Sequence, residues 1–205
     1  MNTRTLRFLS RSLLLYHTTH RSFTTTAIKM SAPSLPHQII SSLRSLHQPL
    51  PLATAESCTG GLIANELTDI PGSSEVFRIG VVAYSEEAKE GVLGVARETI
   101  REKGVVSEEV AVEMAKGARL QALKTLSDST PNLAYGISTT GELGLGSQQD
   151  TAWLAIVGPE ESRIRTKLLK GDQIRWDRKT NKLVTAYEAL ELLREQIEGW
   201  KKDSD

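Results

Sequence analysis

Short apolar runs rich in β-branched residues alternate with segments of helical periodicity along residues 35–200. The apolar runs have the length of strands and lie between clusters of glycine, proline, serine and asparagine. The segments between them carry apolar residues three and four positions apart, for example Ile39, Ile40, Leu43 and Leu46. Strands and helices of this kind bury their apolar faces against one another in layers. The sequence therefore predicts an α/β fold, a single layered domain in which helices flank a mixed β-sheet.

The expected elements can be placed along the chain. Strands are expected at 49–55, 75–85, 133–139, 151–158 and 162–170. Helices are expected at 35–48, 62–70, 86–94, 97–104, 108–126 and 183–200. Ser85 and Ser107 stand directly before two of these helices, where a serine hydroxyl can accept a hydrogen bond from the first turn. The last helix is amphipathic and is expected to pack Leu183, Tyr187 and Leu190 against the sheet.

The N-terminal region differs from the rest of the chain in charge. Residues 1–34 contain five basic residues, no acidic residue and many serines and threonines. This composition is typical of a mitochondrial transit peptide, and it predicts a disordered leader that directs the protein to the mitochondrial matrix. Met30 is an internal start that would give a cytoplasmic form, and a disordered tail without a targeting role is the alternative. The domain is then expected at 35–200, with a short tail at 201–205.

Charge and cysteine content exclude several function classes. Without the leader, 20 basic residues stand against 25 acidic ones, which disfavours nucleic-acid binding. No apolar run approaches the length of a membrane span, so no membrane partner is expected. The single cysteine, Cys58, permits no internal disulfide and belongs to no zinc-ligand pattern, so no metal is expected.

All histidines lie in the first quarter of the chain, at positions 17, 20, 37 and 47. They precede every segment in which a nucleophile could be placed, so a Ser-His-Asp or Cys-His arrangement is disfavoured. A nucleophilic hydrolase built on this chain would need a lysine, a tyrosine, a carboxylate or a bound water as its base.

The first candidate site is the stretch "ESCTGG", residues 56–61, between an expected strand and an expected helix. Unpaired backbone N–H groups at such a junction favour an anion or a developing oxyanion, and the glycines allow close approach of a ligand. Ser57 can therefore be a nucleophile, but Ser57 or Thr59 can equally be a simple helix cap. Cys58 can attack as well, although a small buried core residue is its more usual role.

The second candidate site contains Tyr84, at the end of the strand expected at 75–85, and Lys89, five positions later. Both can face the same edge of the sheet as Ser57. Lys89 could take a proton from Ser57 only if its pKa fell by roughly three units from about 10.4, through burial or a cationic neighbour. The alternative is a solvated lysine in an acidic helix.

The third candidate site is the glycine-rich stretch "ISTTGELGLGSQQD", residues 137–150. Its hydroxyls and glycines fit a loop that wraps a small polar ligand. It is neither a P-loop nor a dinucleotide-binding fingerprint, because the required lysine and glycine spacings are missing. A hairpin connection that binds nothing is the alternative.

The stretch "TAESCTGGLIANELTDIPGSSEVFRIGVVAYSEEAKEGVLGV", residues 54–95, closely resembles the C-terminal domain of the CinA family. The resemblance continues more loosely and covers about residues 37–197. Stand-alone members of this family are nicotinamide-nucleotide amidases, which hydrolyse nicotinamide mononucleotide to nicotinic acid mononucleotide and ammonia. The resemblance implies the layered fold, a pyridine nucleotide as ligand, no cofactor, and a homo-oligomer. The pyrophosphatase-like domain of the larger bacterial members is not expected here.

The resemblance also implies roles for individual residues. Ser57 would be the nucleophile, and Tyr84 and Lys89 would activate it and transfer protons. Five residues would shape the loop and supply oxyanion or phosphate contacts: Glu56, Cys58, Thr59, Gly60 and Gly61. Four more would bind the substrate, with the two glycines on its ribose-phosphate side: Thr140, Gly141, Gly144 and Arg178.

The chain departs from the family pattern in the second half of the expected site. Where the family reads Thr-Gly-Ile-Ala-Gly-Pro and later Lys-Pro-Val-Gly, this chain reads "TTGELGLGSQQDTAW", and Gln173 replaces a family arginine. A positive substrate contact is therefore expected to be lost. Three hypotheses follow: an amidase acting on nicotinamide mononucleotide, an amidase acting on another small amide, and a non-catalytic nucleotide-binding or oligomeric member of the family.

Overall fold

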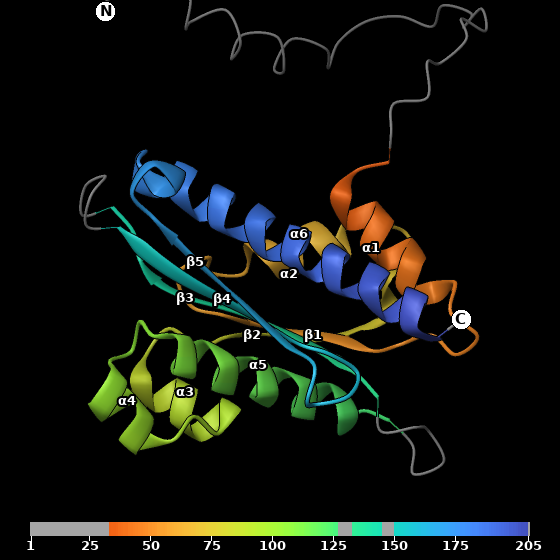
Figure 1. Cartoon of the computed structure of the whole chain (residues 1–205), viewed down its shortest axis with the longest axis horizontal. Helices are drawn as coiled ribbons and strands as arrows, with labels where there is room; N and C mark the ends of the chain where they lie inside the picture. Colours follow the sequence, from red (N-terminus) through yellow and green to blue (C-terminus); the bar gives the residue numbers. More distant parts are fainter. Residues whose placement is uncertain (1–32, 127–132, 145–149, 205) are drawn as a thin grey trace, which may run out of the picture. The chain divides into compact units, whose positions relative to one another are not determined.

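A computed structural model of the chain describes residues 33–126, 133–144 and 150–204. These residues form a mixed five-stranded sheet covered by helices on both faces, which confirms the predicted α/β layers (Figure 1). The segment predicted to be a mitochondrial leader lies outside the described residues, except for residues 33 and 34.

The sheet is parallel on one side and antiparallel on the other. Its strand order is β2-β1-β3-β4-β5; β1 pairs in parallel with β2 and β3, whereas β3, β4 and β5 pair antiparallel. The strands are β1 (Leu52–Glu56), β2 (Phe77–Val82), β3 (Tyr135–Glu142), β4 (Thr151–Val157) and β5 (Ile164–Lys170). Because β1 is parallel to both neighbours, Glu56 lies beside Val82 on one side and Thr139 on the other. The residues that follow these three positions therefore meet at one edge.

Two helical layers enclose the sheet (Figure 1). One layer contains α1 (Leu35–Arg44), α2 (Leu62–Thr68) and α6 (Arg178–Ser204), and the other contains α3 (Glu86–Leu93), α4 (Arg97–Lys103) and α5 (Glu108–Leu123). Short 3-10 helices occur at Ser73–Glu75 and Gly171–Ile174. The predicted caps are confirmed, since the Ser85 hydroxyl accepts the Ala88 N–H at 3.2 Å and the Ser107 hydroxyl accepts the Val110 N–H at 3.3 Å.

Helix α5 lies directly on the sheet. A Cβ atom at Gly136 of β3 would come within 2.0 Å of the Ala115 carbonyl oxygen, so only glycine allows this approach. The tight packing holds α5 in a fixed position against β3. Val105 and Val106, which precede α5, are thereby held close to the end of β3, where they line the cavity described below.

Helix α6 begins five residues earlier than the sequence pattern predicted, at Arg178 instead of Leu183, and it continues through 201–204, where a tail was expected. The prediction that Leu183 and Tyr187 are buried was wrong, because they are 39% and 45% exposed. The short helix α2 covers Tyr187 only in part, and the Tyr187 hydroxyl reaches Glu66 of α2 at 3.2 Å.

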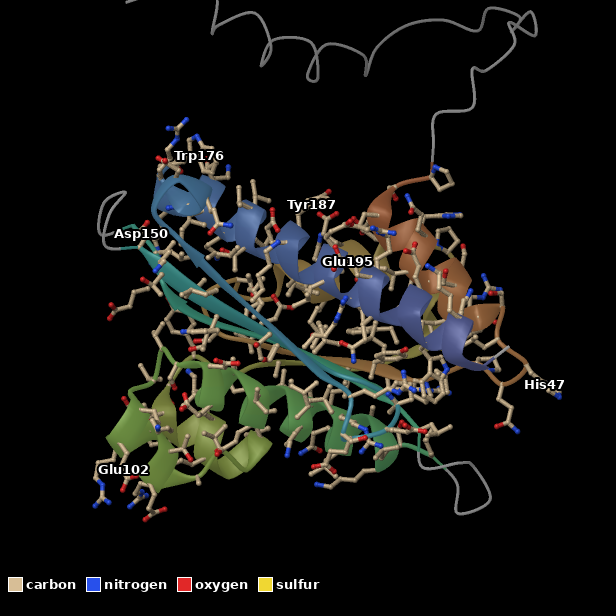
Figure 2. All side chains as sticks on the ribbon, in the orientation of Figure 1. His47, Glu102, Asp150, Trp176, Tyr187 and Glu195 are labelled. Atoms are coloured by element: carbon tan, nitrogen blue, oxygen red, sulfur yellow. The ribbon has the colours of Figure 1, made fainter. Side chains whose placement is uncertain are left out.

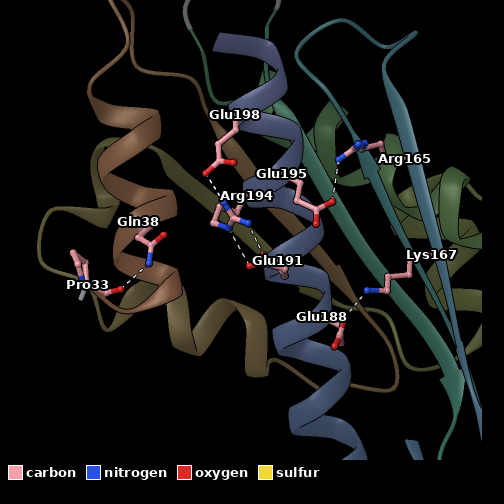
Figure 3. Close-up of polar contacts among 9 residues, drawn as sticks. All are labelled: Pro33, Gln38, Arg165, Lys167, Glu188, Glu191, Arg194, Glu195 and Glu198. Carbon is pink, nitrogen blue, oxygen red and sulfur yellow. Dashed lines mark hydrogen bonds and ion pairs between the residues drawn. The ribbon is translucent and has the colours of Figure 1, made fainter. Parts of the chain in front are cut away.

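Ion pairs join α6 to the edge strand β5 (Figure 3). Lys167 of β5 contacts Glu188 at 2.6 Å, and Arg165 contacts Glu195 at 3.2 Å. All four side chains are at least one-third exposed, so each pair adds little to stability. The attachment of α6 depends mainly on its buried residues Leu190, Leu193 and Ile197.

Candidate active site

The carboxyl ends of the parallel strands surround a cavity of about 250 Å³. Ser57 follows β1, Tyr84 follows β2, and Thr140 and Gly141 lie near the end of β3. In open α/β sheets, ligands bind at this edge, where neighbouring strands connect in opposite directions. Seven predicted site residues line the cavity, including the three proposed catalytic ones: Ser57, Cys58, Tyr84, Lys89, Thr140, Gly141 and Arg178.

Ser57 and Lys89 form a buried hydrogen-bonded pair. The Ser57 N–H donates to the Thr139 carbonyl at 3.0 Å, which fixes the serine at the end of β1. The Lys89 ammonium donates to Ser57 Oγ at 3.1 Å and to the Ala83 carbonyl at 3.0 Å. Lys89 is 1% exposed, although it lies on an acidic helix, so the alternative of a solvated lysine was wrong.

Burial lowers the pKa of Lys89 below its ordinary value, because the ammonium loses water contacts. The neighbouring Cys58 thiol and the Glu86 carboxylate oppose this shift. No carboxylate forms an ion pair with Lys89 among the described residues. A lysine in this environment can lose its proton more readily and act as a base toward the serine hydroxyl.

Glu56, not Ser57 or Thr59, caps helix α2. One Glu56 carboxylate oxygen accepts the Gly61 N–H at 2.9 Å and the Ile63 N–H at 3.1 Å, and the other accepts the Ala64 N–H at 2.8 Å. The Thr59 hydroxyl donates to the same carboxylate at 2.7 Å. Glu56 and Thr59 are 1% and 0% exposed, and they support the loop from behind without lining the cavity.

The capping by Glu56 limits where an oxyanion can be held. Among the N–H groups proposed for this purpose, that of Gly60 donates to the Ser57 carbonyl at 3.1 Å and that of Gly61 donates to Glu56. The N–H groups of Cys58 and Thr59 make no hydrogen bond to another described residue. Cys58 lines the cavity, so its N–H is the backbone donor next to Ser57 that remains for a substrate oxygen, whereas Thr59 is fully buried behind the loop.

Cys58 is not poised to react. Its side chain is 2% exposed, and burial raises the pKa of the thiol to about 12. The thiolate is the nucleophilic form, so its population at neutral pH is very small. The thiol is therefore a small buried group in the wall of the cavity and in the hydrophobic core, as expected from its residue type.

The Cys58 thiol is expected to react with a disulfide reagent on the order of 100-fold or more slowly in the native protein than in urea at the same pH. The reagent releases a coloured thiolate when it reacts with a cysteine. Since the chain has one cysteine, the rate of this release reports on Cys58 alone. Equal rates in the two states would show an accessible thiolate and would return Cys58 to consideration as the nucleophile.

Arg178 connects the segments that follow β2 and β3 at the mouth of the cavity. Its guanidinium donates to the Tyr84 hydroxyl at 2.6 Å and to the Leu143 carbonyl. Tyr84 is 61% exposed, so its phenol lies at the entrance of the cavity. Gly144 allows the approach of Arg178: its φ is +96°, and a Cβ there would lie 3.0 Å from Arg178 Cβ.

Asp150 holds the glycine-rich segment against the start of α6. One carboxylate oxygen of Asp150 accepts the Gly144 N–H at 2.8 Å and the Asn181 side-chain amide at 2.6 Å. Asn181 also donates to the Trp176 carbonyl at 3.0 Å, and Figure 2 shows Asp150 and Trp176 at this end of the sheet. The sequence pattern gave no reason to single out Asp150, because its partner lies 31 positions away.

Two cavity residues, Val105 and Val106, lie outside all three candidate sites, whereas Glu142 and Leu143 belong to the third candidate site without having been named as binding residues. Val105 and Val106 precede α5 and carry no motif; the Thr140 hydroxyl donates to the Val105 carbonyl at 2.8 Å and joins them to the site. Three predicted glycines, Gly60, Gly61 and Gly144, do not line this cavity.

A second cavity, of about 460 Å³, lies beside the first and shares Arg178 with it. Its lining residues are Leu62, Arg178, Lys179, Lys182 and Leu183. Within the described residues, no cluster of three or more histidine, cysteine or acidic side chains could hold a metal ion. None of the described helices combines the length and the apolar character needed to cross a membrane.

Comparisons with known proteins match most of the domain. The family model of the CinA C-terminal domain matches residues 33–197. A competence-damage inducible protein of Caldanaerobacter subterraneus subsp. tengcongensis is 42% identical over 157 residues, which cover 74% of this chain and 35% of that protein. A CinA-like protein of Geotalea daltonii is 40% identical over 146 residues, which cover 71% of this chain and 33% of that protein. The chain spans about a third of the length of these curated relatives.

Solved structures share the fold. A CinA superfamily protein of Klebsiella pneumoniae 700603 matches with a TM-score of 0.68 at 27% identity, covering 81% of this chain and 97% of that one. A competence/damage inducible protein of Agrobacterium tumefaciens matches with a TM-score of 0.64 at 31% identity, covering 80% of this chain and 96% of that one.

Proposed function

Since the chain belongs to the CinA C-terminal domain family, we propose that it is an amidohydrolase that converts nicotinamide mononucleotide to nicotinic acid mononucleotide and ammonia. The observation that supports this proposal most strongly is the buried contact between Lys89 and Ser57, at 3.1 Å. A binding protein would need neither the hydroxyl nor the amine, whereas a serine hydrolase without a histidine needs a nucleophilic hydroxyl and another base, and here the amine of Lys89 contacts that hydroxyl.

In the proposed reaction, Ser57 Oγ attacks the carboxamide carbon while neutral Lys89 takes the hydroxyl proton. The carbonyl oxygen becomes an oxyanion, which the N–H group of Cys58 stabilises. The Lys89 ammonium then gives its proton to the departing nitrogen, so ammonia leaves and an ester remains on Ser57. Water attacks this ester with Lys89 again as base, and the carboxylate product and free Ser57 are released.

Tyr84 has a supporting role in this scheme. Its phenol oxygen accepts a hydrogen bond from Arg178, which leaves the phenol O–H free to donate to a bound substrate. Because Tyr84 lies at the entrance and Lys89 at the buried end, an amide that reaches Ser57 meets Tyr84 before it meets Lys89.

Ammonia release from nicotinamide mononucleotide tests the proposal, with the chain starting at Met30 and its Ser57→Ala variant assayed in parallel. We expect steady turnover by the unchanged chain and a loss of at least about 10³-fold in kcat in the variant. The variant should unfold at the same temperature, because Ser57→Ala removes a single hydroxyl.

Three results would contradict the proposal. Full activity in Ser57→Ala would remove the serine from the mechanism. Binding of the nucleotide by folded protein without any turnover would favour the non-catalytic alternative, and turnover of other small amides in its place would favour a different substrate.

A further inference from the structure

A third cavity, of about 170 Å³, lies among the start of β3, the start of β5 and the end of α6. The Tyr135 cavity, as we call it here, is lined by Tyr135, Pro159, Ile164, Gln196 and Trp200, among others. Strand β3 begins at Tyr135 and ends at Glu142, and Glu142 lines the cavity that contains Ser57. The two cavities therefore lie at opposite ends of β3, and they share no lining residue.

Two buried polar atoms in the wall of the Tyr135 cavity lack a hydrogen-bond partner among the described residues. They are the Tyr135 hydroxyl and Gln196 Oε1, and the two side chains are 0% and 7% exposed. The described part of the chain contains one further atom of this kind, the Thr54 hydroxyl, which does not line the cavity. An unpaired buried polar group costs free energy, so native proteins contain few of them. Two such atoms in one cavity indicate that a bound molecule pairs with them.

The surroundings of these two atoms determine which hydrogen bonds they can make. The Gln196 side-chain N–H donates to the Arg163 carbonyl at 2.7 Å, so the amide oxygen is the atom that remains, and it can only accept. Burial raises the pKa of Tyr135, so its phenol keeps its proton and can donate. A ligand that satisfies both atoms therefore accepts a hydrogen bond from Tyr135 and donates one to Gln196.

The charges around the cavity favour a neutral ligand. Arg165 contacts Glu195 at 3.2 Å (Figure 3), and Arg163 contacts Glu160 at 3.4 Å. Both arginines line the cavity, and each already has a carboxylate beside it. An anionic ligand would have to compete with these carboxylates, and a cationic ligand would meet two like charges.

The remaining wall favours a small apolar ring. Pro159, Ile164 and the Trp200 indole place apolar surface beside the two polar atoms. The Arg163 guanidinium lies over the Trp200 ring, 4.9 Å from its centroid, and this contact helps to hold the indole in place. Because close-packed matter fills about three quarters of its volume, 170 Å³ holds roughly ten non-hydrogen atoms. An aromatic ring with one amide substituent has this size.

We propose that the Tyr135 cavity binds a small neutral aromatic carboxamide. The amide N–H donates to Gln196 Oε1, the amide carbonyl accepts from the Tyr135 hydroxyl, and the ring packs against the apolar wall. A carboxamide carries its donor and its acceptor on separate atoms, so it can satisfy both unpaired atoms at once, whereas a carboxylate offers no donor. The cavity is separate from Ser57, so this ligand is not the molecule on which Ser57 acts.

Titration of benzamide into the full chain carrying Ser57→Ala tests this proposal, since the variant cannot use Ser57 to hydrolyse the probe. Trp200 is one of three tryptophans, and its indole N–H signal in an NMR spectrum is identified by its loss in Trp200→Phe. We expect benzamide to shift this signal. We also expect benzamide to bind at least about threefold more tightly than N,N-dimethylbenzamide, which lacks the amide N–H, and than benzoate, which is an anion.

Tyr135→Phe, added to the same chain, removes the hydroxyl and is expected to weaken benzamide binding at least about threefold. Its midpoint of urea unfolding without ligand should be unchanged or higher, because the hydroxyl that is lost has no partner. Tyr187→Phe is the matched control. It also removes a tyrosine hydroxyl, but one that contacts Glu66 outside the cavity, so the affinity for benzamide should not change.

Several results would overturn the proposal: a Trp200 signal that benzamide does not shift, equal affinities for the three ligands, or an affinity that Tyr135→Phe leaves unchanged. An equal loss of affinity in Tyr187→Phe would indicate a general change in the domain and would also overturn it. The comparison of the three ligands leaves the cavity unaltered, so it decides the question even if Tyr135→Phe does not fold. None of these measurements depends on ammonia release, so the amidase proposal stands or fails separately.

Discussion

Replacing Lys89 by methionine is expected to lower kcat for nicotinamide mononucleotide hydrolysis by at least about 10³-fold. Lys89 is the group in contact with Ser57 Oγ that can remove its proton, and methionine fills a similar volume without a basic nitrogen. The fold should persist, because the buried ammonium already loses its water contacts in the native state. Ammonia release and thermal unfolding, measured on the same preparation, check both parts.

Lys89→Arg is the informative control for this variant. Arginine keeps a positive charge and hydrogen-bond donors near Ser57 but cannot lose its proton in a protein. If Lys89 acts as a base, Lys89→Arg is as inactive as Lys89→Met. If Lys89 contributes only its charge, Lys89→Arg keeps much of the activity, and the assignment of Lys89 as base is wrong.

The pH dependence of the unchanged chain gives a second check on Lys89. Because burial lowers the pKa of Lys89, the neutral amine becomes populated below the ordinary lysine value of 10.5. The base is active when neutral, so kcat/KM should rise with pH and level off, with a midpoint below 10.5. A rate that falls as pH increases from 6 to 9, over a range in which the protein stays folded, would contradict this role.

The second large effect is expected from Glu56→Ala, which should lower the free energy of unfolding by about 3–5 kcal/mol. The change removes the acceptor of four hydrogen bonds at the start of α2. The Thr59 hydroxyl and the Ile63 N–H lie in buried surroundings, so water replaces the lost acceptor poorly. Urea unfolding at neutral pH measures the loss.

Glu56→Gln separates the lost hydrogen bonds from the lost charge. A glutamine oxygen in place of the carboxylate oxygen that accepts from Thr59, Gly61 and Ile63 keeps three of the four bonds. The expected destabilisation is then smaller, about 1–2 kcal/mol. If Glu56→Ala and the unchanged chain had the same urea concentration at the midpoint of unfolding, the stability of the protein would not depend on this cap of α2.

The fold class followed from local patterns. Apolar spacing distinguishes strands from helices over short windows, and Ser85 and Ser107 act on N–H groups only three positions away. Both signals are contained in neighbouring residues, so the layered domain and the starts of α3 and α5 could be predicted. That Ser57, Tyr84 and Lys89 would lie together was predicted from the family resemblance of residues 54–95, a continuous stretch that contains all three residues.

Local sequence patterns were therefore enough to predict the alternation of strands and helices, and the family resemblance was enough to single out the segment around Ser57. The folded arrangement was needed to show that Lys89 is buried, that Glu56 caps α2, and that Lys182 lies close to Gly60. The physical reason is distance along the chain. Lys89 is buried against Ser57, 32 positions before it, and Lys182 of α6 approaches Gly60 from more than one hundred positions away, so no local pattern can register either contact.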